Sequence, residues 1–489
     1  MRLTSRGLAL PTTTLSTGDY SLATGQTQRV VDANGFFLTT QSGFTPPSLT
    51  ISGALEVTSD AAMAPNPPLS GVDVDGFNSF FQNSVLRITS SGSIRADTTL
   101  TFNEAYGVHT GAWSPRVIND GTVDAEAKTH AWGMNLGGLQ QADQAVTLLN
   151  RGTIVANSVH QATGVSLLMG GSVENSGHIL ASGTGGVVGL WYSQGYSSLI
   201  NTGEIRAVDT GGGQSTAVVF ASELAGNLRP TPVDIGIWRN DGVIAGDVAL
   251  KIIQTSSTEI AQVFVNNGQM FGAVQADLGR QTLVNSGVIQ GAVDLGGDND
   301  IYDGRLGSAS GMVAGGSGAD SLAGGARFDS LQGNMGDDTV DGGSGGSDWL
   351  VGGQGADQIT AHADQNILYG NLGNDTLQAG SGGDLLRGGQ GDDSITGGSG
   401  NDWISGDRGN DTISGGAGAD IFHGSQDAGI DRVVDFNLAQ GDRVMLDPGT
   451  TYTLMQVGAD TVLDMGGGHQ MILVGVSMAS LTPGWVFGA

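Results

Sequence analysis

Cysteine is absent from this chain of 489 residues. Disulfide bonds therefore cannot hold its fold together, and zinc fingers, thiolate metal sites and cysteine nucleophiles are excluded. Long apolar runs are absent as well: no stretch approaches the roughly 18 consecutive apolar residues of a membrane-spanning helix, so we expect no membrane insertion. The apolar run before Pro11 is too short for a signal-peptide core, so we expect no export through an N-terminal signal.

Basic residues are scarce. The chain has 19 Lys and Arg against 48 Asp and Glu, a formal net charge of -29, and its two lysines are Lys128 and Lys251. Phosphates repel such an anionic surface, which excludes nucleic acid as a partner. Hard cations such as calcium prefer carboxylate and carbonyl oxygens, and many of these aspartates lie between glycines. Calcium is therefore the first partner that we expect.

Charged residues make up only 14% of the chain, while glycine alone contributes 84 residues. This composition indicates repeats rather than an ordinary globular enzyme. Hydrophobic residues still make up 38% of the chain, which is more than a disordered chain contains. Two different repeats are present, and both predict folded structure.

The first repeat reads apolar-x-Asn-x-Gly-x-apolar and recurs between about residues 80 and 291. Its copies hold Asn119 and Gly121, Asn150 and Gly152, Asn175 and Gly177, Asn201 and Gly203, Asn240 and Gly242, Asn266 and Gly268, and Asn285 and Gly287. Successive glycines lie between 19 residues (Gly268 to Gly287) and 39 residues (Gly203 to Gly242) apart. A coil of a parallel β-helix needs roughly 20 to 25 residues and tolerates loops at its corners, so this spacing favours that fold.

Asparagine and glycine suit the corners of such coils because both accept left-handed backbone angles. Stacked asparagine side chains can also hydrogen-bond to one another along the helix axis. We therefore predict an all-β fold with a right-handed parallel β-helix over residues 81–295. Weaker copies around Gly53 and Gly92 predict an N-terminal cap and first coils within residues 1–80.

The second repeat begins near residue 296, is nine residues long in nearly every copy, and reads Gly-Gly-x-Gly-x-Asp-x-apolar-x. One insertion precedes Asp348, and Asn366 replaces the acid in a degenerate copy. The aspartates that we expect to bind calcium are Asp300, Asp320, Asp329, Asp338, Asp348, Asp357, Asp375, Asp384, Asp393, Asp402, Asp411 and Asp420. The turn glycines that we expect at the same ions are Gly316, Gly318, Gly389, Gly391, Gly398, Gly400, Gly409, Gly416 and Gly418.

Each copy provides a six-residue turn and a three-residue strand. The apolar strand residues that we expect in the core are Leu322, Leu331, Val340, Leu350, Ile359, Leu368, Leu377, Leu385, Ile395, Ile404, Ile413 and Phe422. Two copies complete one coil, so we expect Asp375 to stack on Asp393 and Asp402 on Asp420. Neighbouring strands lie about 4.8 Å apart, where two carboxylates at an effective dielectric constant of about 20 repel by roughly 3 kcal/mol. Without calcium these coils should be largely unfolded.

This nonapeptide resembles the calcium-binding repeat of the RTX, or hemolysin-type, family, and the tract from about 296 to 489 resembles RTX proteins exported by type I secretion. The resemblance implies a parallel β-roll over residues 296–423 that binds several Ca2+ ions. It also implies a C-terminal β cap and secretion signal over residues 424–489. The type I secretion apparatus is then a partner, and the protein is secreted to the outside or the cell surface of a Gram-negative bacterium. A plain β cap without a targeting role is the alternative.

Catalytic patterns are weak, and no HExxH zinc-protease motif occurs. Candidates for a carboxylate cluster in sugar chemistry are Asp73, Asp75, Glu104, Asp120 and Asp124, with His109 beside them. Polar loop residues explain them equally well. We expect His109, His130, His160 and His178 at the surface, because none has metal-ligand spacing. The aromatic residues Trp113, Trp132, Trp191, Tyr192 and Tyr196 are either contact points for glycans or subunits, or core residues.

The Asn-x-Gly coils resemble the passenger repeats of autotransporter-like adhesins and haemagglutinins. Together with the calcium repeats they predict a secreted, non-enzymatic structural or adhesive protein of the cell surface, such as a surface-layer, filament or biofilm-matrix subunit. Its expected partners are further copies of itself or a cell-surface glycan. The alternative is a secreted polysaccharide-active enzyme, a lyase, epimerase or hydrolase, with its active site on the β-helix. A pore-forming toxin ranks third.

Overall fold

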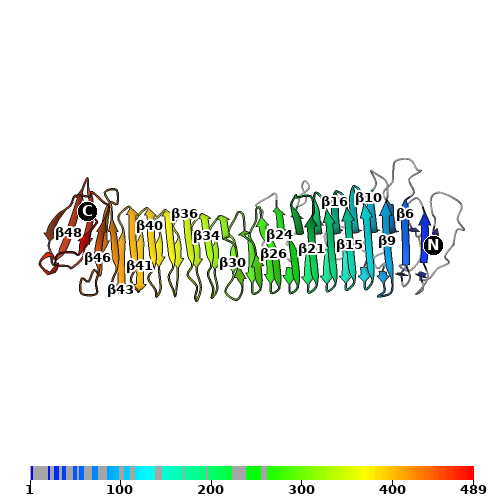
Figure 1. Ribbon diagram of the computed structural model, residues 1–489, viewed down its shortest axis with the longest axis horizontal. Helices are drawn as coiled ribbons and strands as arrows, with labels where there is room; N and C mark the ends of the chain where they lie inside the picture. The colour runs from blue at the N-terminus through cyan, green and yellow to red at the C-terminus, as the bar shows by residue number, and fades with distance from the viewer. Residues whose placement is uncertain are drawn as a thin grey trace, which may run out of the picture. The chain divides into compact units, whose positions relative to one another are not determined.

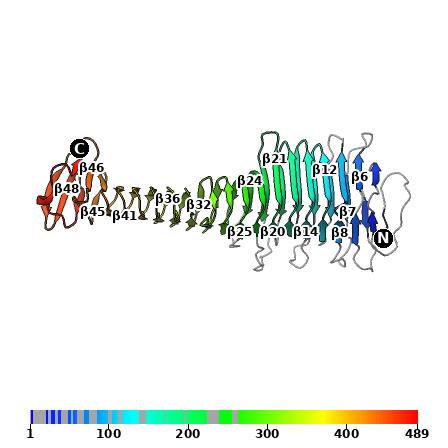
Figure 2. The same cartoon turned by 60° about the horizontal axis from the view of Figure 1, so that its bottom comes forward.

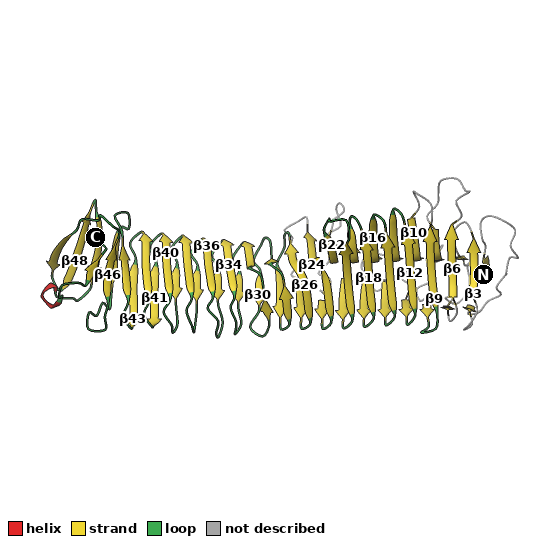
Figure 3. Cartoon of the chain, viewed as in Figure 1, coloured by secondary structure: helices red, strands yellow, loops and turns green. Residues whose placement is uncertain are grey.

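The computed structural model describes side chains over residues 85–97, 104–109, 116–137, 146–168, 171–193, 197–221, 238–253 and 262–488, and some backbone strands before residue 85. Strands dominate these residues, and one short 3-10 helix, η2 (Met478–Ser480), lies near the C-terminus (Figure 3). No described helix is long and apolar enough to span a bilayer. The chain divides into two compact units, residues 1–278 with 288–291, and residues 279–287 with 292–489.

The first unit is a parallel β-helix, as predicted. Each coil has three short strands, and each strand pairs in parallel with the equivalent strand of the next coil (Figure 1). The first strands of the coils are β8 (Val85–Ile88), β11 (Arg116–Asn119), β14 (Val146–Asn150), β17 (Gly171–Asn175), β20 (Ser197–Asn201), β23 (Trp238–Asn240) and β25 (Gln262–Asn266). The second strands are β9 (Ser93–Thr98), β12 (Thr122–Ala127), β15 (Thr153–Ser158), β18 (His178–Gly183) and β21 (Glu204–Asp209). The third strands are β10 (Glu104–Thr110), β13 (His130–Leu136), β16 (Gln161–Leu167), β19 (Val187–Ser193) and β22 (Ser215–Ser222).

The C-terminal end of this ladder departs from the three-strand pattern. The single strand β24 (Val243–Gln254) pairs with both β21 and β22, and β26 (Gln269–Ala276) and β28 (Val288–Gln290) follow it.

Before residue 85 the strands are β1 (Arg2–Leu3), β2 (Tyr20–Leu22), β3 (Thr27–Val31), β4 (Phe36–Thr39), β5 (Ser48–Ile51), β6 (Ala54–Ser59) and β7 (Leu69–Val74). They pair in parallel with the same strand positions, except that β1 runs antiparallel to β4. The parallel coils therefore begin well before residue 80.

In the core of the first unit, equivalent strand positions of successive coils hold the same type of residue. In the second strands, aligned alanines from successive coils are buried, each at most 3% exposed: Ala96, Ala125, Ala156, Ala181 and Ala207. Strand residues alternate between the two faces of a sheet, and the coil cross-section repeats, so each coil offers the same space to the same residue. This stacking lets short strands share one core that no single coil could form.

An asparagine ladder runs along the first strands, as the sequence predicts. Each side-chain Nδ2 donates to Oδ1 of the asparagine in the next coil at 2.6 to 2.8 Å, through Asn119, Asn150, Asn175, Asn201, Asn240 and Asn266. All six side chains are buried. The neighbouring glycines are required for a different reason from the predicted one. A Cβ atom on Gly152 would lie 2.0 Å from the carbonyl oxygen of Gly121, so close backbone approach, rather than a left-handed angle, excludes a side chain.

The second unit contains a β-roll of two parallel sheets, in which each coil has one strand in either sheet. Its strands follow one another along the unit in both views (Figures 1 and 2). One sheet contains β27 (Gln281–Asn285), β30 (Ile301–Asp303), β33 (Ser321–Ala323), β35 (Thr339–Asp341), β37 (Gln358–Thr360), β39 (Thr376–Gln378), β41 (Ser394–Ser399), β43 (Thr412–Ala417) and β45 (Ile430–Val433). The other contains β29 (Val293–Asp294), β32 (Val313–Ser317), β34 (Ser330–Met335), β36 (Trp349–Gln354), β38 (Ile367–Leu372), β40 (Leu385–Gln390), β42 (Trp403–Arg408), β44 (Ile421–Gly424) and β46 (Arg443–Leu446). The short strand β31 (Ser308–Ala309) precedes β32.

One apolar residue per repeat fills the core of the roll. Eleven of the twelve predicted core residues are at most 1% exposed, and the prediction for Leu385 is wrong. Leu386 occupies the core position of that repeat, at 0% exposed, while Leu385 is only half-buried on the outside of β40. The repeat has two leucines in succession after Asp384, and the pleat of the strand turns the second one inward.

After the roll, three antiparallel strands form a cap. They are β47 (Thr453–Val457), β48 (Asp460–Gly466) and β49 (His469–Leu473), followed by β50 (Val486–Phe487). The cap joins the roll because β49 pairs with β45, and β50 pairs with β46, both in parallel. Phe436 packs between Phe422, the last core residue of the repeats, and Trp485, with ring centroids 5.9 Å from each. These aromatic side chains cover the end of the roll's apolar core.

Candidate metal centre

The repeat aspartates form two buried rows in the second unit. In each row the backbone N–H of one acid donates to Oδ1 of the acid in the next coil, as Asp375 does to Asp393 at 2.8 Å and Asp384 does to Asp402 at 2.8 Å. All twelve predicted aspartates are at most 5% exposed. One row holds Asp300, Asp320, Asp338, Asp357, Asp375, Asp393 and Asp411, and the other holds Asp329, Asp348, Asn366, Asp384, Asp402 and Asp420. The stacking predicted from the nine-residue period is present.

Two further acids extend these rows, and sequence reasoning did not include them. Asp411 N–H donates to Asp431 Oδ1 at 3.3 Å, and Asp420 N–H donates to Asp442 Oδ1 at 3.1 Å. Both side chains are buried. They lie 20 and 22 residues after their partners instead of 18, because longer loops interrupt the nonapeptide here. Each keeps the Asp-x-apolar part of the repeat, with Val433 or Val444 two residues after the aspartate, and this was the signal that could have found them.

Most of the second carboxylate oxygens in these rows have no hydrogen-bond donor, although Oδ2 of Asp329 accepts the N–H of Gly325 at 2.8 Å. Among the described residues, Oδ2 is buried and without a donor in Asp300, Asp320, Asp338, Asp357, Asp375, Asp384, Asp393, Asp402, Asp411, Asp420 and Asp431. An unpaired buried carboxylate oxygen is costly unless a proton or a cation faces it. These oxygens therefore fit a hard divalent cation, which prefers oxygen ligands.

Asn366 shows what surrounds such an oxygen. It occupies an aspartate position, and its amide Nδ2 donates to the backbone carbonyls of Ala363 at 3.0 Å and Asp364 at 3.2 Å. It also donates to Oδ1 of Asp384 at 3.0 Å. Where an aspartate replaces the asparagine, the amide donor is lost and an acceptor takes its place. A cation would then be needed to hold these oxygen atoms together.

The first glycine of each repeat leaves room for the carboxylate. A Cβ atom on Gly388 would lie 2.1 Å from Oδ2 of Asp393, and one on Gly406 would lie 2.0 Å from Oδ2 of Asp411. Sequence reasoning named only later glycines of the repeats. All nine of those, Gly316, Gly318, Gly389, Gly391, Gly398, Gly400, Gly409, Gly416 and Gly418, have positive φ angles between 93° and 144°. They let the turn close at left-handed backbone positions, and their expected place at the calcium ions stays a prediction.

Burial raises the pKa values of these carboxyl groups. The pKa rises to about 8 for Asp300 and Asp393 and to about 7 for Asp338 and Asp402, mainly because the charged form loses water, with neighbouring aspartates adding to the shift. No group of three or more His, Cys, Asp or Glu side chains suited to a metal occurs in the described part of the chain. Cations in these rows would therefore combine row carboxylates with backbone carbonyls of the turns. Bound there, they would neutralise the stacked charges.

Among the carboxylates considered for sugar chemistry whose side chains are described, Glu104 and Asp120 bind different partners. Glu104 accepts a hydrogen bond from Tyr106 Oη at 3.1 Å, and Asp120 pairs with Arg151 at 2.6 Å. Burial raises the pKa of Asp124, which lies on β12. His109 on β10 aligns with Asp73 on β7 in backbone register, but the side chain of Asp73, and all of Asp75, lie outside the described residues.

The histidine and aromatic predictions have mixed outcomes. His160 and His178 are exposed, as expected, but His130 is half-buried and stacks on Trp132 at a ring-centroid distance of 3.4 Å. Tyr192 is a core residue at 0% exposed, and its hydroxyl donates to the carbonyl of Ser198 at 2.8 Å. Trp191 lies at the surface. Trp113 and Tyr196 fall outside the described residues.

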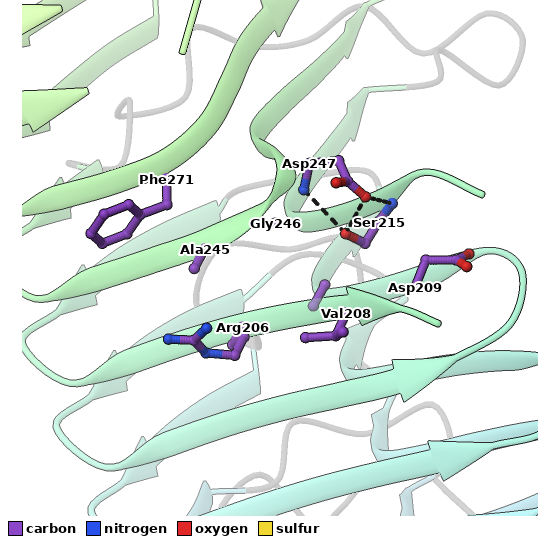
Figure 4. A pocket seen from close by; sticks show the side chains of 9 residues that line it. Arg206, Val208, Asp209, Ser215, Ala245, Gly246, Asp247 and Phe271 are labelled. Atoms are coloured by element: carbon purple, nitrogen blue, oxygen red, sulfur yellow. Dashed lines mark hydrogen bonds between the residues drawn. The ribbon is translucent and has the colours of Figure 1, made fainter. Parts of the chain in front are cut away.

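A cavity of about 270 Å³ lies in the first unit where β24 replaces two strands by one (Figure 4). Its walls include Asp209, Ser215, Asp247 and Phe271. Asp247 Oδ2 accepts hydrogen bonds from the backbone N–H and the hydroxyl of Ser215 at 2.9 and 2.7 Å, which lower the pKa of its carboxyl group. Asp209 Oδ1 accepts from the N–H of two loop glycines. Polar and apolar side chains both line this cavity.

The string Gly-Gly-Ser-Gly-Gly at residues 342–346 formally fits the Gly-x-Ser-x-Gly pattern of serine hydrolases. That pattern supports a nucleophile only on a tight turn between a strand and a helix. Here Ser344 lies in a β-roll turn between β35 and β36, and its backbone N–H donates to Gly325 O at 2.8 Å. The string belongs to the calcium repeat.

Comparisons with known proteins agree with the geometry of the second unit. Residues 314–430 match the family model of the RTX calcium-binding nonapeptide repeat (4 copies), in overlapping segments at 314–346, 343–377, 369–404, 378–413 and 396–430. No curated protein matches the chain. Among solved structures, the chain is similar to the crystal structure of the extracellular lipase LipA from Serratia marcescens, at 16% identity and a TM-score of 0.18. The similarity covers 51% of this chain and 45% of that lipase, so the chain spans less than half of the lipase's length. Residues 314–430 are thus RTX calcium-binding nonapeptide repeats, and arrays of such repeats bind several Ca2+ ions.

Proposed function

We propose that this protein is a secreted, calcium-dependent structural or adhesive component of a bacterial cell surface, such as a surface-layer, filament or biofilm-matrix subunit. The observation that carries the proposal is the pair of buried aspartate rows, in which most second oxygens have no donor. RTX repeats are typical of secreted extracellular bacterial proteins. The C-terminal segment 424–489 would carry the signal for type I secretion from a Gram-negative cell, and the ligands would be the row aspartates and turn carbonyls.

Calcium would act as a folding switch. In the absence of the ion, the stacked carboxylates oppose closure of the roll, by roughly 3 kcal/mol for each adjacent charged pair. At a calcium concentration ten times the dissociation constant, each site contributes about 1.4 kcal/mol to folding. Extracellular calcium modules bind in the range of about 10⁻⁴ to 10⁻³ M. The roll would therefore remain unfolded inside the cell and fold outside it.

The β-helix would then serve as the scaffold that binds or stacks. Its apolar core and asparagine ladder continue from coil to coil, which suits a scaffold that presents its outer faces. Such a scaffold would bind further copies or a cell-surface glycan through those faces.

Electron microscopy with and without millimolar calcium, and circular dichroism on the same samples, test this function. We expect β structure in the second unit, and ordered assemblies, only with calcium. Full folding in the presence of a chelator would contradict the calcium switch. A calcium-folded protein that neither assembles nor binds any glycan would contradict the structural and adhesive role.

A polysaccharide-active enzyme is the second candidate, and the cavity between β21, β22 and β24 favours it. Two carboxylates, Asp209 and Asp247, line that cavity with Ser215 and Phe271 (Figure 4), and paired carboxylates are the groups of glycoside hydrolysis. Product release from a panel of glycans tests this candidate. Activity that Asp247→Asn abolishes would favour the enzyme, whereas activity that survives this change would place the chemistry elsewhere.

A further inference from the structure

The two outer faces of the β-roll differ in chemistry. On one face the first outward residue of successive strands is Ser321, Thr339, Gln358, Thr376, Ser394 and Thr412, which we call the polar row. On the other face the equivalent positions of β36, β38, β40, β42 and β44 are Trp349, Ile367, Leu385, Trp403 and Ile421, which we call the apolar row. Nothing in the calcium repeat requires this difference, because the seventh position of the nonapeptide is unconstrained.

The apolar row is accessible. Trp349 is 49% exposed and Ile367 is 38% exposed, while Leu385, Trp403 and Ile421 are half-buried by their neighbours. The members are direct partners across parallel strands, about 4.8 Å apart, so the row is straight and about 19 Å long. A contiguous exposed apolar patch on a soluble protein marks an interaction surface.

The same face carries little charge. The next outward positions on these strands hold Val351, Tyr369, Arg387, Ser405 and His423. Across β34, β36, β38, β40, β42 and β44 the one acid is Asp407, and Arg387 binds it at 2.8 and 3.0 Å. Asp447 also lies 3.1 Å from His423 Nε2 at the end of this face. In a chain with 48 acidic residues, these two acids are few, so little charge would repel a second copy, since like charges across an interface cost several kcal/mol.

The order of residues in the row is complementary to itself. If two rows face each other in opposite directions about a two-fold axis through Leu385, Trp349 meets Ile421 and Ile367 meets Trp403. Each large ring then lies against a smaller aliphatic side chain, the arrangement that fills space between packed layers. A two-fold interface requires such self-complementarity of one patch.

We propose that the apolar row of the β-roll is the surface through which two copies of this chain associate face to face. The inference rests on the proposed function and names the contact of its self-association. The row is small compared with the roughly 1,600 Å² of a standard interface, so the dimer is weak and forms at high local concentration, as on a crowded cell surface. The row exists only in the folded roll, so association requires calcium.

Cross-linking tests the geometry, because the chain has no cysteine. Leu385→Cys places one thiol at the two-fold axis, and Thr376→Cys places one on the polar row as the matched control. With calcium and a short bismaleimide, we expect covalent dimers from Leu385→Cys at least ten times more abundant than from Thr376→Cys. Equal yields from the two variants would overturn the proposal.

Sedimentation equilibrium of the full chain with calcium tests the energetics. Ile367→Glu and Gln358→Glu add the same charge on opposite faces. Ile367→Glu should weaken dimerisation at least ten-fold, because it buries a carboxylate against Trp403 of the second copy, whereas Gln358→Glu should change it less than three-fold. A wild-type chain that stays monomeric at high concentration, or equal effects of the two variants, would overturn the proposal.

Circular dichroism of each sample separates this inference from the function on which it rests. Loss of the calcium-dependent fold itself would contradict the proposed function. A chain that folds with calcium but does not dimerise contradicts only the inference. Calcium-folded monomers that bind a neutral soluble glucan, and lose it in Ile367→Glu, would assign the apolar row to a glycan instead and would also overturn the proposal.

Discussion

The backbone N–H of Asp375 donates to Oδ1 of Asp393, one coil further along, at 2.8 Å. The same carboxylate leaves its Oδ2 buried without a donor. In most row aspartates one oxygen therefore serves the fold, and the other is available for a cation. A change from aspartate to asparagine can therefore test the two oxygens separately. The amide oxygen can still accept the backbone hydrogen bond, but the amide nitrogen in place of Oδ2 cannot bind a cation.

Asp393→Asn should remove calcium binding at its position while preserving the coil. The amide oxygen can accept the N–H of Asp375, and the amide nitrogen can donate to turn carbonyls as Asn366 does. We expect fewer calcium ions per chain in equilibrium dialysis and a less cooperative folding transition. Asp392→Asn is the control, because Asp392 is the exposed neighbour with the same charge. Equal calcium stoichiometry in both variants would argue against Asp393 as a ligand.

The reverse change, Asn366→Asp, should create a calcium requirement. It removes the donor that joins Asp384 Oδ1 to the carbonyls of Ala363 and Asp364, and leaves acceptors only. At calcium concentrations that only just fold the wild type, we expect destabilisation of about 1 to 3 kcal/mol, the cost of unsatisfied buried polar groups. In saturating calcium the loss should disappear, and dialysis should show more bound calcium than in the wild type. Unchanged stoichiometry with persistent destabilisation would mean that this turn cannot accept the ion.

The sequence predicted the rows because a strict period leaves few alternatives. An aspartate every nine residues, with two repeats per coil, places Asp384 under Asp402 whatever the other residues are. The prediction did not extend beyond the regular period. Asp431 and Asp442 follow longer loops, and the fold places them next to Asp411 and Asp420 in the rows. The ligand role of each aspartate stays a prediction.

The prediction of Leu385 as a core residue departed from the repeat. Leu385 and Leu386 are adjacent and equally apolar, but the repeat places its apolar residue two positions after the aspartate, which is Leu386 after Asp384. The structure has Leu386 in the core. The apolar row escapes notice when the repeats are compared one after another, because its members occur in alternate repeats, from Trp349 to Ile367 and on to Ile421. These residues form a row only because alternate repeats contribute their strands to the same sheet.

The asparagine ladder should stabilise the first unit. Asn175→Ala removes the acceptor of Asn150 Nδ2 at 2.6 Å and the donor to Asn201 Oδ1 at 2.7 Å. Both remaining groups are buried, so we expect a loss of about 2 to 4 kcal/mol, measured by urea unfolding with tryptophan fluorescence. Ser176→Ala changes the exposed neighbouring corner residue and should have an effect within about 0.5 kcal/mol. Similar effects of the two changes would mean that the corner backbone, rather than the ladder, holds the coils.

Acid should partly replace calcium. Burial raises the pKa of Asp338 and Asp402 to about 7 and that of Asp393 to about 8, above the usual value of about 3.9 for the unfolded chain. A carboxyl group whose pKa is raised by folding stabilises the fold fully below its unfolded pKa, and this contribution is lost as pH rises through the folded pKa. In a chelator, the circular dichroism signal of folded β structure should therefore be larger at pH 5 than at pH 8. A double variant, Asp393→Asn with Asp402→Asn, should show a smaller difference, because two of the titrating groups are gone. A signal that instead rises from pH 5 to pH 8 in the chelator would mean that the rows fold with ionised carboxylates, and that calcium does not act by replacing their protons.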